Sequence, residues 1–156
     1  MLDSGPLIAL AIVGELRVLQ HLYARAVVPD AVLSEILAGP VERPGARDIQ
    51  SASWLERVQL DSPPEPLLIK ELGAGEAEAI ALAARLEGAV ILDERAGRRI
   101  AREVYGLQVR GTVGILAAAK RAGHLSQLRP VLQQLKTAGY YLTTEIIDGA
   151  ARSVGE

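Results

Sequence analysis

Apolar stretches of two lengths alternate along the chain. Short apolar runs at residues 26–28, 89–92 and 107–110 end at turn-forming or polar residues, as strands do. Longer segments repeat apolar residues three and four positions apart, which predicts helices. The run at 89–92 is apolar throughout, so we expect it to lie at the centre of a sheet. This alternation of strands and helices favours a parallel sheet with helices on both faces.

The spacing of apolar residues and the helix-capping residues set the boundaries of the expected helices. One helix is predicted from Leu7 to Tyr23, and another over 31–37 follows Pro29, with Asp30 as its cap. Further helices are expected over 76–86, 95–105, 113–122 and 125–138, and a last one runs from Thr143 or Thr144 toward Val154.

The remaining segments are shorter. Residues 47–52 are expected to form a turn of helix, 54–60 an edge strand and 140–142 a last short strand. Glycine and proline place a loop at 39–45, and prolines at 63–66 mark a break before the helix that begins at Glu76.

Length and composition narrow the class of protein. A chain of 156 residues with 49% hydrophobic residues forms one domain, residues 1–156, and has enough apolar surface for a core. A net charge of −2 argues against a uniformly basic nucleic-acid binder but allows a local basic patch. The lack of cysteine excludes disulfides and thiolate chemistry, and two histidines are too few for a histidine-rich metal site. The apolar run at 7–13 is too short to span a membrane and lacks a signal peptide's basic start, so we expect a cytoplasmic protein.

Two aspartates follow apolar strands. Asp3 comes after Leu2, nearly all that is left of a first strand, and Asp93 follows the run at 89–92. The carboxyl ends of parallel strands meet at one edge of the sheet, where open α/β proteins bind ligands. Glu76 stands at a helix start, where its charge suits the helix dipole, and Gly75 lets the backbone approach closely. These acids predict a pocket for Mg²⁺ or Mn²⁺, which would relieve their mutual repulsion.

Two further glutamates are less constrained by the pattern. Glu78 lies about 200° around the helix from Glu76, so both cannot face one pocket, and Glu78 is expected to face solvent or to support the site. Glu35 lies off the apolar face of its helix, but the periodicity does not require it to enter the pocket. Each acid alone has an ordinary structural reading as a turn former, a helix-terminal charge or a solvated residue. The ordered set favours a site.

Five segments that carry these acids, taken in this order, resemble the PIN-domain nuclease family. The resemblance is strongest to small prokaryotic members, including toxins of the VapC type and uncharacterised predicted nucleic-acid-binding proteins. It extends from residue 2 to about residue 120, and so covers most of the chain. It implies a three-layer α/β/α fold in which helices flank a short central parallel sheet. The segments are Leu2–Leu10, Val28–Leu37, Gly75–Ala83, Ile91–Arg95 and Gly111–Leu116.

The resemblance implies a metal-dependent endoribonuclease. Asp3, Glu35, Glu76 and Asp93 match the four family acids in order. Asp3, Glu76 and Asp93 would hold one or two Mg²⁺ or Mn²⁺ ions, which would orient a water for in-line attack on an RNA phosphodiester. Glu35 would help to position that water or a second ion.

The remaining implications concern neighbouring residues and partners. Ser4 and Thr112 would stand beside the acids as hydroxyl helpers. Glu76 departs from the commonest toxin pattern, in which the third acid is an aspartate, and the nearly absent first strand is a second departure. The resemblance further implies a homodimer and, for a toxin, a small antitoxin protein as partner.

Four arginines follow Asp93 on one predicted helix. Arg95, Arg98, Arg99 and Arg102 are three and four positions apart and can share a face that contacts RNA phosphates. The alternative is a solvated, salt-bridged helix face. With only 3% aromatic residues, the chain does not resemble a base-stacking RNA-binding module.

Two other functions remain open from the sequence. A PIN-like protein without catalysis would keep the fold and use the arginines to bind RNA or a partner protein. A Mg²⁺-dependent phosphotransfer, phosphatase or receiver-type domain would also need an acidic pocket. Against this second alternative, Asp3 is followed by Ser4-Gly5-Pro6 rather than by the second aspartate of a haloacid-dehalogenase-like phosphatase. A strand-end lysine suited to a receiver domain is also missing.

Overall fold

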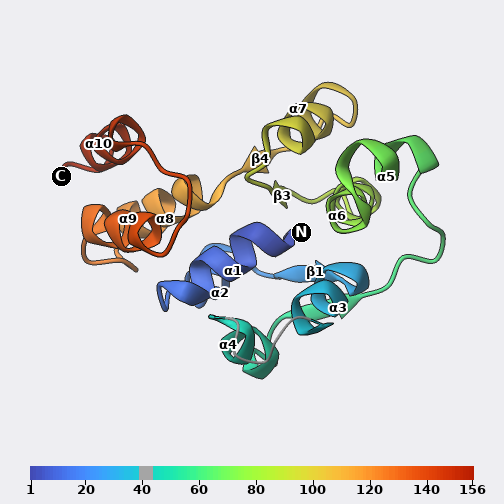
Figure 1. Cartoon of the computed structure of the whole chain (residues 1–156), viewed down its shortest axis with the longest axis horizontal. Coiled ribbons are helices and arrows are strands. Elements are labelled where there is room, and N and C mark those ends of the chain that lie inside the picture. The colour runs from blue at the N-terminus through green and yellow to red at the C-terminus, as the bar shows by residue number, and fades with distance from the viewer. Residues whose placement is uncertain (39–43) are drawn as a thin grey trace.

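The computed structural model describes residues 1–38 and 44–156 (Figure 1). Its strands are β1 (Val27–Pro29), β2 (Glu56–Val58), β3 (Val90–Ile91) and β4 (Val109–Arg110). Its helices are α1 (Ser4–Ile12), α2 (Val18–Leu22), α3 (Asp30–Ala38), α4 (Ala46–Ser51), α5 (Pro66–Leu72), α6 (Ala74–Arg85), α7 (Arg95–Glu103), α8 (Thr112–Arg121), α9 (Leu128–Thr137) and α10 (Thr144–Arg152).

The first three residues join two pairs of strands. β1 pairs in parallel with β2, and β3 pairs in parallel with β4. Leu2 N donates to Val27 O at 3.0 Å, while Asp3 N donates to Ile91 O at 3.2 Å. Ile91 N donates in turn to Met1 O at 2.8 Å. The spatial order is therefore β2, β1, residues 1–3, β3, β4. The chain continues from residues 1–3 to β1 on one side, and β3 lies on the other side. Asp3 therefore stands at the topological switch point, the usual ligand position in such sheets.

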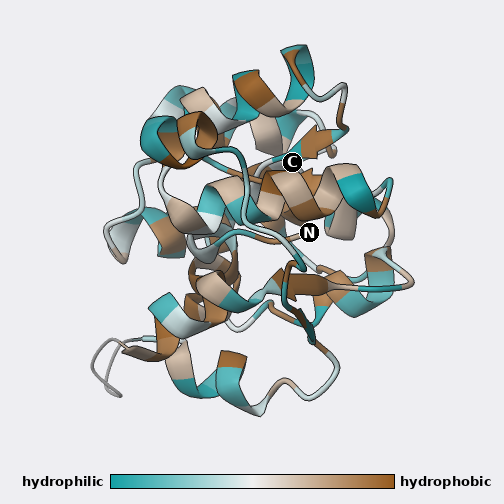
Figure 2. Ribbon diagram, turned by 90° about the vertical axis from the view of Figure 1, so that its right-hand side faces the viewer, coloured by the Kyte–Doolittle hydropathy of each residue, from teal (hydrophilic) through white to brown (hydrophobic). Residues whose placement is uncertain are grey.

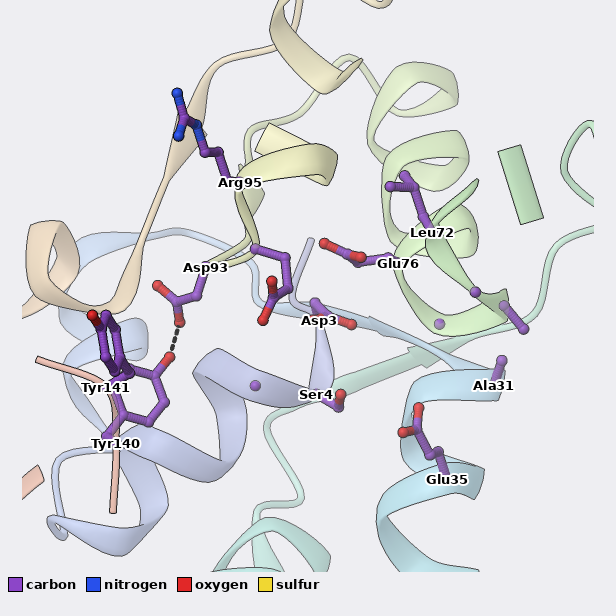
Figure 3. A pocket seen from close by; sticks show the side chains of 15 residues that line it. Asp3, Ser4, Ala31, Glu35, Leu72, Glu76, Asp93, Arg95, Tyr140 and Tyr141 are labelled. Carbon is purple, nitrogen blue, oxygen red and sulfur yellow. Dashed lines mark hydrogen bonds between the residues drawn. The ribbon is translucent and has the colours of Figure 1, made fainter. Parts of the chain in front are cut away.

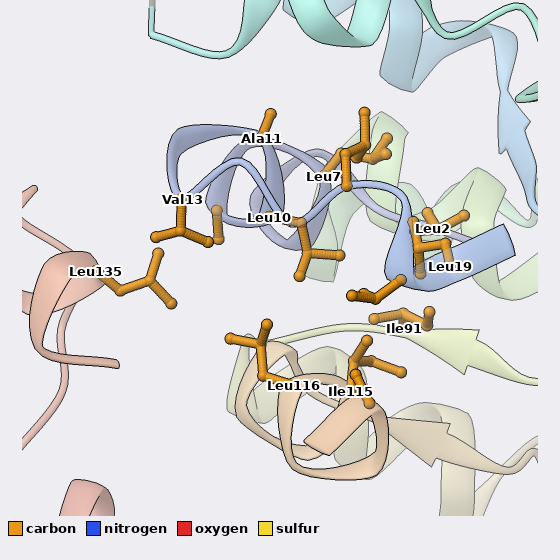
Figure 4. Close-up of a cluster of buried hydrophobic side chains, with 14 of the residues drawn as sticks. Leu2, Leu7, Leu10, Ala11, Val13, Leu19, Ile91, Ile115, Leu116 and Leu135 are labelled. Carbon is orange, nitrogen blue, oxygen red and sulfur yellow. The ribbon is translucent and has the colours of Figure 1, made fainter. Parts of the chain in front are cut away.

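Helices cover both faces of this sheet. Successive strand residues point to opposite faces. Ile91 accordingly packs with the buried residues of α1, α2, α8 and α9, whereas Val90 and Leu92 pack with those of α5, α6 and α7. Figure 4 shows Ile91 among Leu10 and Ile115 on the first face. In Figure 2 the helices carry both hydrophilic and hydrophobic residues, as expected when one face of each packs inward. The predicted α/β fold with a parallel sheet is confirmed.

The predicted helix from Leu7 to Tyr23 is wrong. The chain forms α1 and α2 instead, separated by a turn at Gly14, whose φ of 73° is left-handed. Both helices bury apolar residues against the same core, among them Leu10 and Leu19. Helical apolar spacing therefore continues across the turn, and periodicity alone could not reveal it.

Two other expectations fail for identifiable reasons. Residues 140–142 form no strand; Leu142 is buried and Tyr141 is exposed because the segment packs along the core without pairing. The prolines at 63–66 predict a break and no helix at α5, yet Pro66 occupies the first turn of that helix, where a missing N–H costs nothing. The edge strand is confirmed as β2. The part of the predicted loop at 39–43 lies outside the described residues.

No helix in the described parts of the chain is both long enough and apolar enough to cross a membrane.

Replacement of Gly14 by alanine tests the turn between α1 and α2. An added Cβ meets no atom within 4 Å, so the expected cost is the left-handed backbone alone, about 1 kcal/mol of unfolding free energy. Gly149→Ala, in open space within α10 and without positive φ, should instead stabilise the protein by about 0.5–1 kcal/mol. Urea unfolding of both variants measures the difference, and equal effects would contradict a strained turn at Gly14.

Candidate active site

A cavity of about 890 Å³ opens at the carboxyl edge of the sheet (Figure 3). Carboxylates from several elements line it, and so do the backbone at residues 73–75 and the start of α1. The acids are Asp3 after the first segment, Glu35 on α3, Glu76 on α6, Asp93 after β3 and Glu94 before α7. The fold therefore brings the four predicted acids to one cavity and adds Glu94 to them.

Asp93 is held by three hydrogen bonds. Thr112 donates to it twice, from its backbone N to Oδ1 at 2.8 Å and from its Oγ1 to Oδ2 at 2.5 Å. The Tyr140 hydroxyl also donates to Asp93 Oδ2, as Figure 3 shows. Thr112 is the first residue of α8, so Asp93 also caps that helix from a distant strand. These bonds orient the carboxylate, and of its roughly four acceptor positions one is left on Oδ1.

Asp3 is buried at the base of the cavity. Its exposed fraction is 8%. Burial raises the pKa of Asp3, the backbone amides of Ser4 and Gly5 oppose that shift, and the charges of Glu35 and Asp93 add to it. The negative charge of Asp3 is thus unfavourable here, and a cation placed beside it would be stabilising.

Glu76 is the most strongly perturbed acid of the cavity. It is 9% exposed, and its Oε1 has no hydrogen-bond partner among the described residues. Burial, followed by the charges of Asp3 and Glu94, raises its pKa to about 7. Gly97 of α7 lies directly against this carboxylate, and a Cβ there would clash with Oε1. A buried carboxylate oxygen without a donor calls for a proton or a cation.

Gly75 separates Glu35 from Asp3. A Cβ at position 75 would lie 3.2 Å from Glu35 Oε2 and 3.6 Å from Asp3 Oδ1. The missing side chain therefore lets α6 approach both carboxylates, as the sequence suggested. Glu35 itself is exposed on α3. Glu78 does not line the cavity and accepts a hydrogen bond from Ala31 N at 3.3 Å, which supports the start of α3.

The predicted hydroxyl helpers and arginines occupy different places. Ser4 lines the acidic cavity, and Thr112 binds Asp93 as described above. Of the arginines, Arg95 lines the acidic cavity and Arg98 a second cavity beside it. Arg102 donates to Val109 O at 3.4 Å, and Arg99 lines neither cavity. The predicted basic face of α7 is thus divided between different surroundings.

The donor set fits a hard divalent cation. Carboxylate oxygens are the ligands that Mg²⁺ and Mn²⁺ prefer, and Asp3, Glu76 and Asp93 all line the cavity. The orphaned Glu76 Oε1 supports this fit. As the side chains stand, no three histidine, cysteine or acidic residues in the described ranges are close enough to hold one ion together.

Sequence reasoning missed three residues of this site. Tyr140 lies 47 positions from Asp93 in a segment without regular structure. Glu94 stands just before α7 and Gly97 lies within it, where the sequence pattern draws attention to the arginines alone. The one available signal was the pair Tyr140-Tyr141 in a chain with 3% aromatic residues.

A parallel α/β fold with acids gathered at the carboxyl edge of its sheet is the arrangement of a metal-dependent nuclease or phosphotransfer domain. A protein-family model described as a PIN domain matches residues 1–156. The chain therefore belongs to the PIN-domain family, whose members are generally nucleases that use divalent metals. Searches of curated proteins and of solved structures returned no match.

The raised pKa of Glu76 predicts a pH-dependent loss of stability when divalent metal is removed. The folded-state pKa of about 7 exceeds the ordinary value of 4.5. The contribution of Glu76 to the free energy of unfolding is therefore fully present below pH 4.5 and is lost as pH rises from there through 7. The loss should be on the order of 2–3 kcal/mol, and Glu76→Gln should remove most of it. Urea unfolding in EDTA across this range measures the difference, and parallel curves for both proteins would contradict the raised pKa.

Proposed function

We propose that the protein is an endoribonuclease that depends on Mg²⁺ or Mn²⁺. The observation that carries this proposal is the buried, unpartnered Oε1 of Glu76 inside a cavity lined by further carboxylates. Such a group is costly to leave unsatisfied, and a divalent cation would satisfy it while relieving the repulsion among its neighbours. Membership of a family of nucleases supports hydrolysis of nucleic acid as the reaction.

Asp3, Glu76 and Asp93 would hold the metal. When bound, a divalent cation neutralises charge on the phosphate and lowers the pKa of a water at the site. Asp93 contributes a fixed orientation, because Thr112 and Tyr140 occupy most of its acceptor positions. Its remaining lone pair on Oδ1 would face the cation.

Glu35 has a different role in the proposed reaction. It is exposed, lies on the far side of Gly75 from Asp3, and lines the same cavity. A carboxylate in that position can orient a water by hydrogen bonding and accept its proton. Arg95 at the same cavity would balance phosphate charge without occupying the acidic base.

A cleavage assay tests the reaction. Wild-type protein should cut single-stranded and structured RNAs with Mn²⁺ or Mg²⁺ and should stop in EDTA. Asp3→Asn should lower the rate about 100-fold or more at equal folding, since an amide lacks the charge that a hard cation requires. Asp93→Asn should lower it as well, while its retained carbonyl can still accept from Thr112 N.

The matched control for this assay is Glu87→Gln. Glu87 is an exposed acid that does not line the cavity, and its replacement should leave cleavage unchanged. If well-folded wild-type protein cuts no RNA with either metal, the nuclease proposal fails and a binding function becomes the better explanation.

Gly97→Ala tests the placement of Glu76 without changing any acid. The added Cβ would displace the Glu76 carboxylate, which is the mobile end of a flexible side chain, so the backbone can stay in place. Cleavage should fall about tenfold or more, while the free energy of unfolding stays unchanged or rises, because alanine suits a helix better than glycine. Gly149→Ala should leave cleavage at the wild-type rate. Loss of both stability and activity in Gly97→Ala would indicate a packing defect instead.

A further inference from the structure

A second cavity of about 530 Å³ adjoins the acidic one. The two share Asp93, Tyr140 and Tyr141 among their lining residues, so they are neighbours. The second cavity is lined by β4, by the first turn of α8, and by Leu142 and Ile146. A chain molecule bound at Asp93 can therefore extend from one cavity into the other.

The charge reverses between the two cavities. The second cavity is lined by three arginines, Arg98, Arg110 and Arg121, and by a single carboxylate, that of Asp93. That carboxylate already accepts hydrogen bonds from Thr112 and Tyr140. The acidic cavity repels phosphates wherever a cation does not screen it, while the second cavity attracts them.

Two of the three arginines of the second cavity are available for a ligand. The side chains of Arg98 and Arg121 make no ion pair or hydrogen bond with any residue in the described ranges. Elsewhere in the chain Arg25, Arg57 and Arg129 each pair with a carboxylate. The guanidinium of Arg98 also lies near the acidic site, because Arg98 Nη1 and Asp93 Oδ1 would be 2.6 Å and 2.9 Å from a Cβ placed on Gly111.

An exposed aromatic ring marks the junction of the cavities. Tyr141 is 88% exposed, whereas the adjacent Tyr140 is half-buried and bound to Asp93. Figure 3 shows Tyr141 beside Tyr140, on the side of Asp93 away from Glu76. The bond from Tyr140 to Asp93 ties this segment to the acidic site and so fixes the position of its neighbour. A flat ring with free access is suited to stack on an unpaired nucleobase.

We propose that the second cavity binds a single-stranded polynucleotide on one side of the bond to be cut, and that Tyr141 stacks on an unpaired base at the junction. Arg98 and Arg121 contact the phosphates of this strand. Within a duplex both faces of each internal base are covered by the neighbouring base pairs, so Tyr141 favours a strand with unpaired bases. This inference rests on the proposed nuclease function, and it names the residues of this chain that hold the strand beside the acidic site.

Binding without metal tests the groove separately from catalysis. Fluorescence anisotropy in EDTA measures the affinity of the protein for three labelled ligands. They are a single-stranded RNA, a DNA of the same sequence, and the RNA duplex. Tyr141→Ala should weaken binding of the single-stranded RNA about 5- to 150-fold, while Tyr141→Phe, which keeps the ring, should restore most of it. An RNA with 2-aminopurine at successive positions should lose fluorescence at one position on wild-type protein, and Tyr141→Ala should abolish that quenching.

The arginines have their own readout. Arg98→Ala or Arg121→Ala should each lower the slope of log affinity against log salt by about 0.7, the value for one phosphate contact on a single strand. Arg47→Ala is the matched control, because Arg47 is exposed on α4 and lines neither cavity. It should leave both the affinity and the slope unchanged.

Two results would overturn the groove proposal. One is a duplex that binds wild-type protein as tightly as the single strand. The other is unchanged affinity, salt slope and quenching in Tyr141→Ala, Arg98→Ala and Arg121→Ala. If these variants are unchanged while wild-type protein still cuts RNA with metal, the nuclease proposal stands and the groove alone fails. If single-strand binding depends on Tyr141 but neither metal supports cleavage, the groove proposal stands and the nuclease proposal fails.

Discussion

The backbone pairing of residues 1–3 between β1 and β3 is the constraint on which the rest of this structure depends. Leu2 donates to Val27 on one side, and Asp3 donates to Ile91 on the other. Without these bonds the sheet would be two separate pairs of strands, and the helices on its faces would have no common core. The same bonds carry Asp3 to the carboxyl edge, beside Asp93. One short segment thus completes the sheet and places the first acid.

The acidic cavity lowers stability so that the site can hold charge. Asp3 and Glu76 are buried, their charges oppose each other, and the Glu76 oxygen lacks a donor. A fold selected for stability alone would place apolar side chains there. Such local conflicts are expected at functional sites, and the large apolar core formed by α1, α2, α8 and α9 offsets the cost. Gly75 and Gly97 extend the pattern, because each leaves out a side chain where a carboxylate needs space.

The sequence predicted those site residues that local rules can place. Asp3 and Asp93 follow strands, Glu76 lies in the first turn of a helix, and parallel strands must bring such residues to one edge. Tyr140 could not be found in this way, since its contact with Asp93 spans 47 positions and depends on how α9 and α10 pack. Gly14 and Pro66 show a second limit. Burial on both sides of a turn preserves helical periodicity, and proline in a first helical turn looks the same as proline in a loop.

The hydrogen bond from Thr112 N to Asp93 makes Asp93 harder to replace during evolution than Glu76. The charge of Glu76 is unfavourable in the fold, so a descendant without the proposed activity could exchange it for a neutral residue and become more stable. Asp93 holds the first turn of α8, and its loss would leave a helix amide without a partner. A lineage that drifted from catalysis would therefore keep Asp93 after Glu76 had changed. An aspartate at the end of β3, standing alone, would mark the ancestry of such a protein and not its activity.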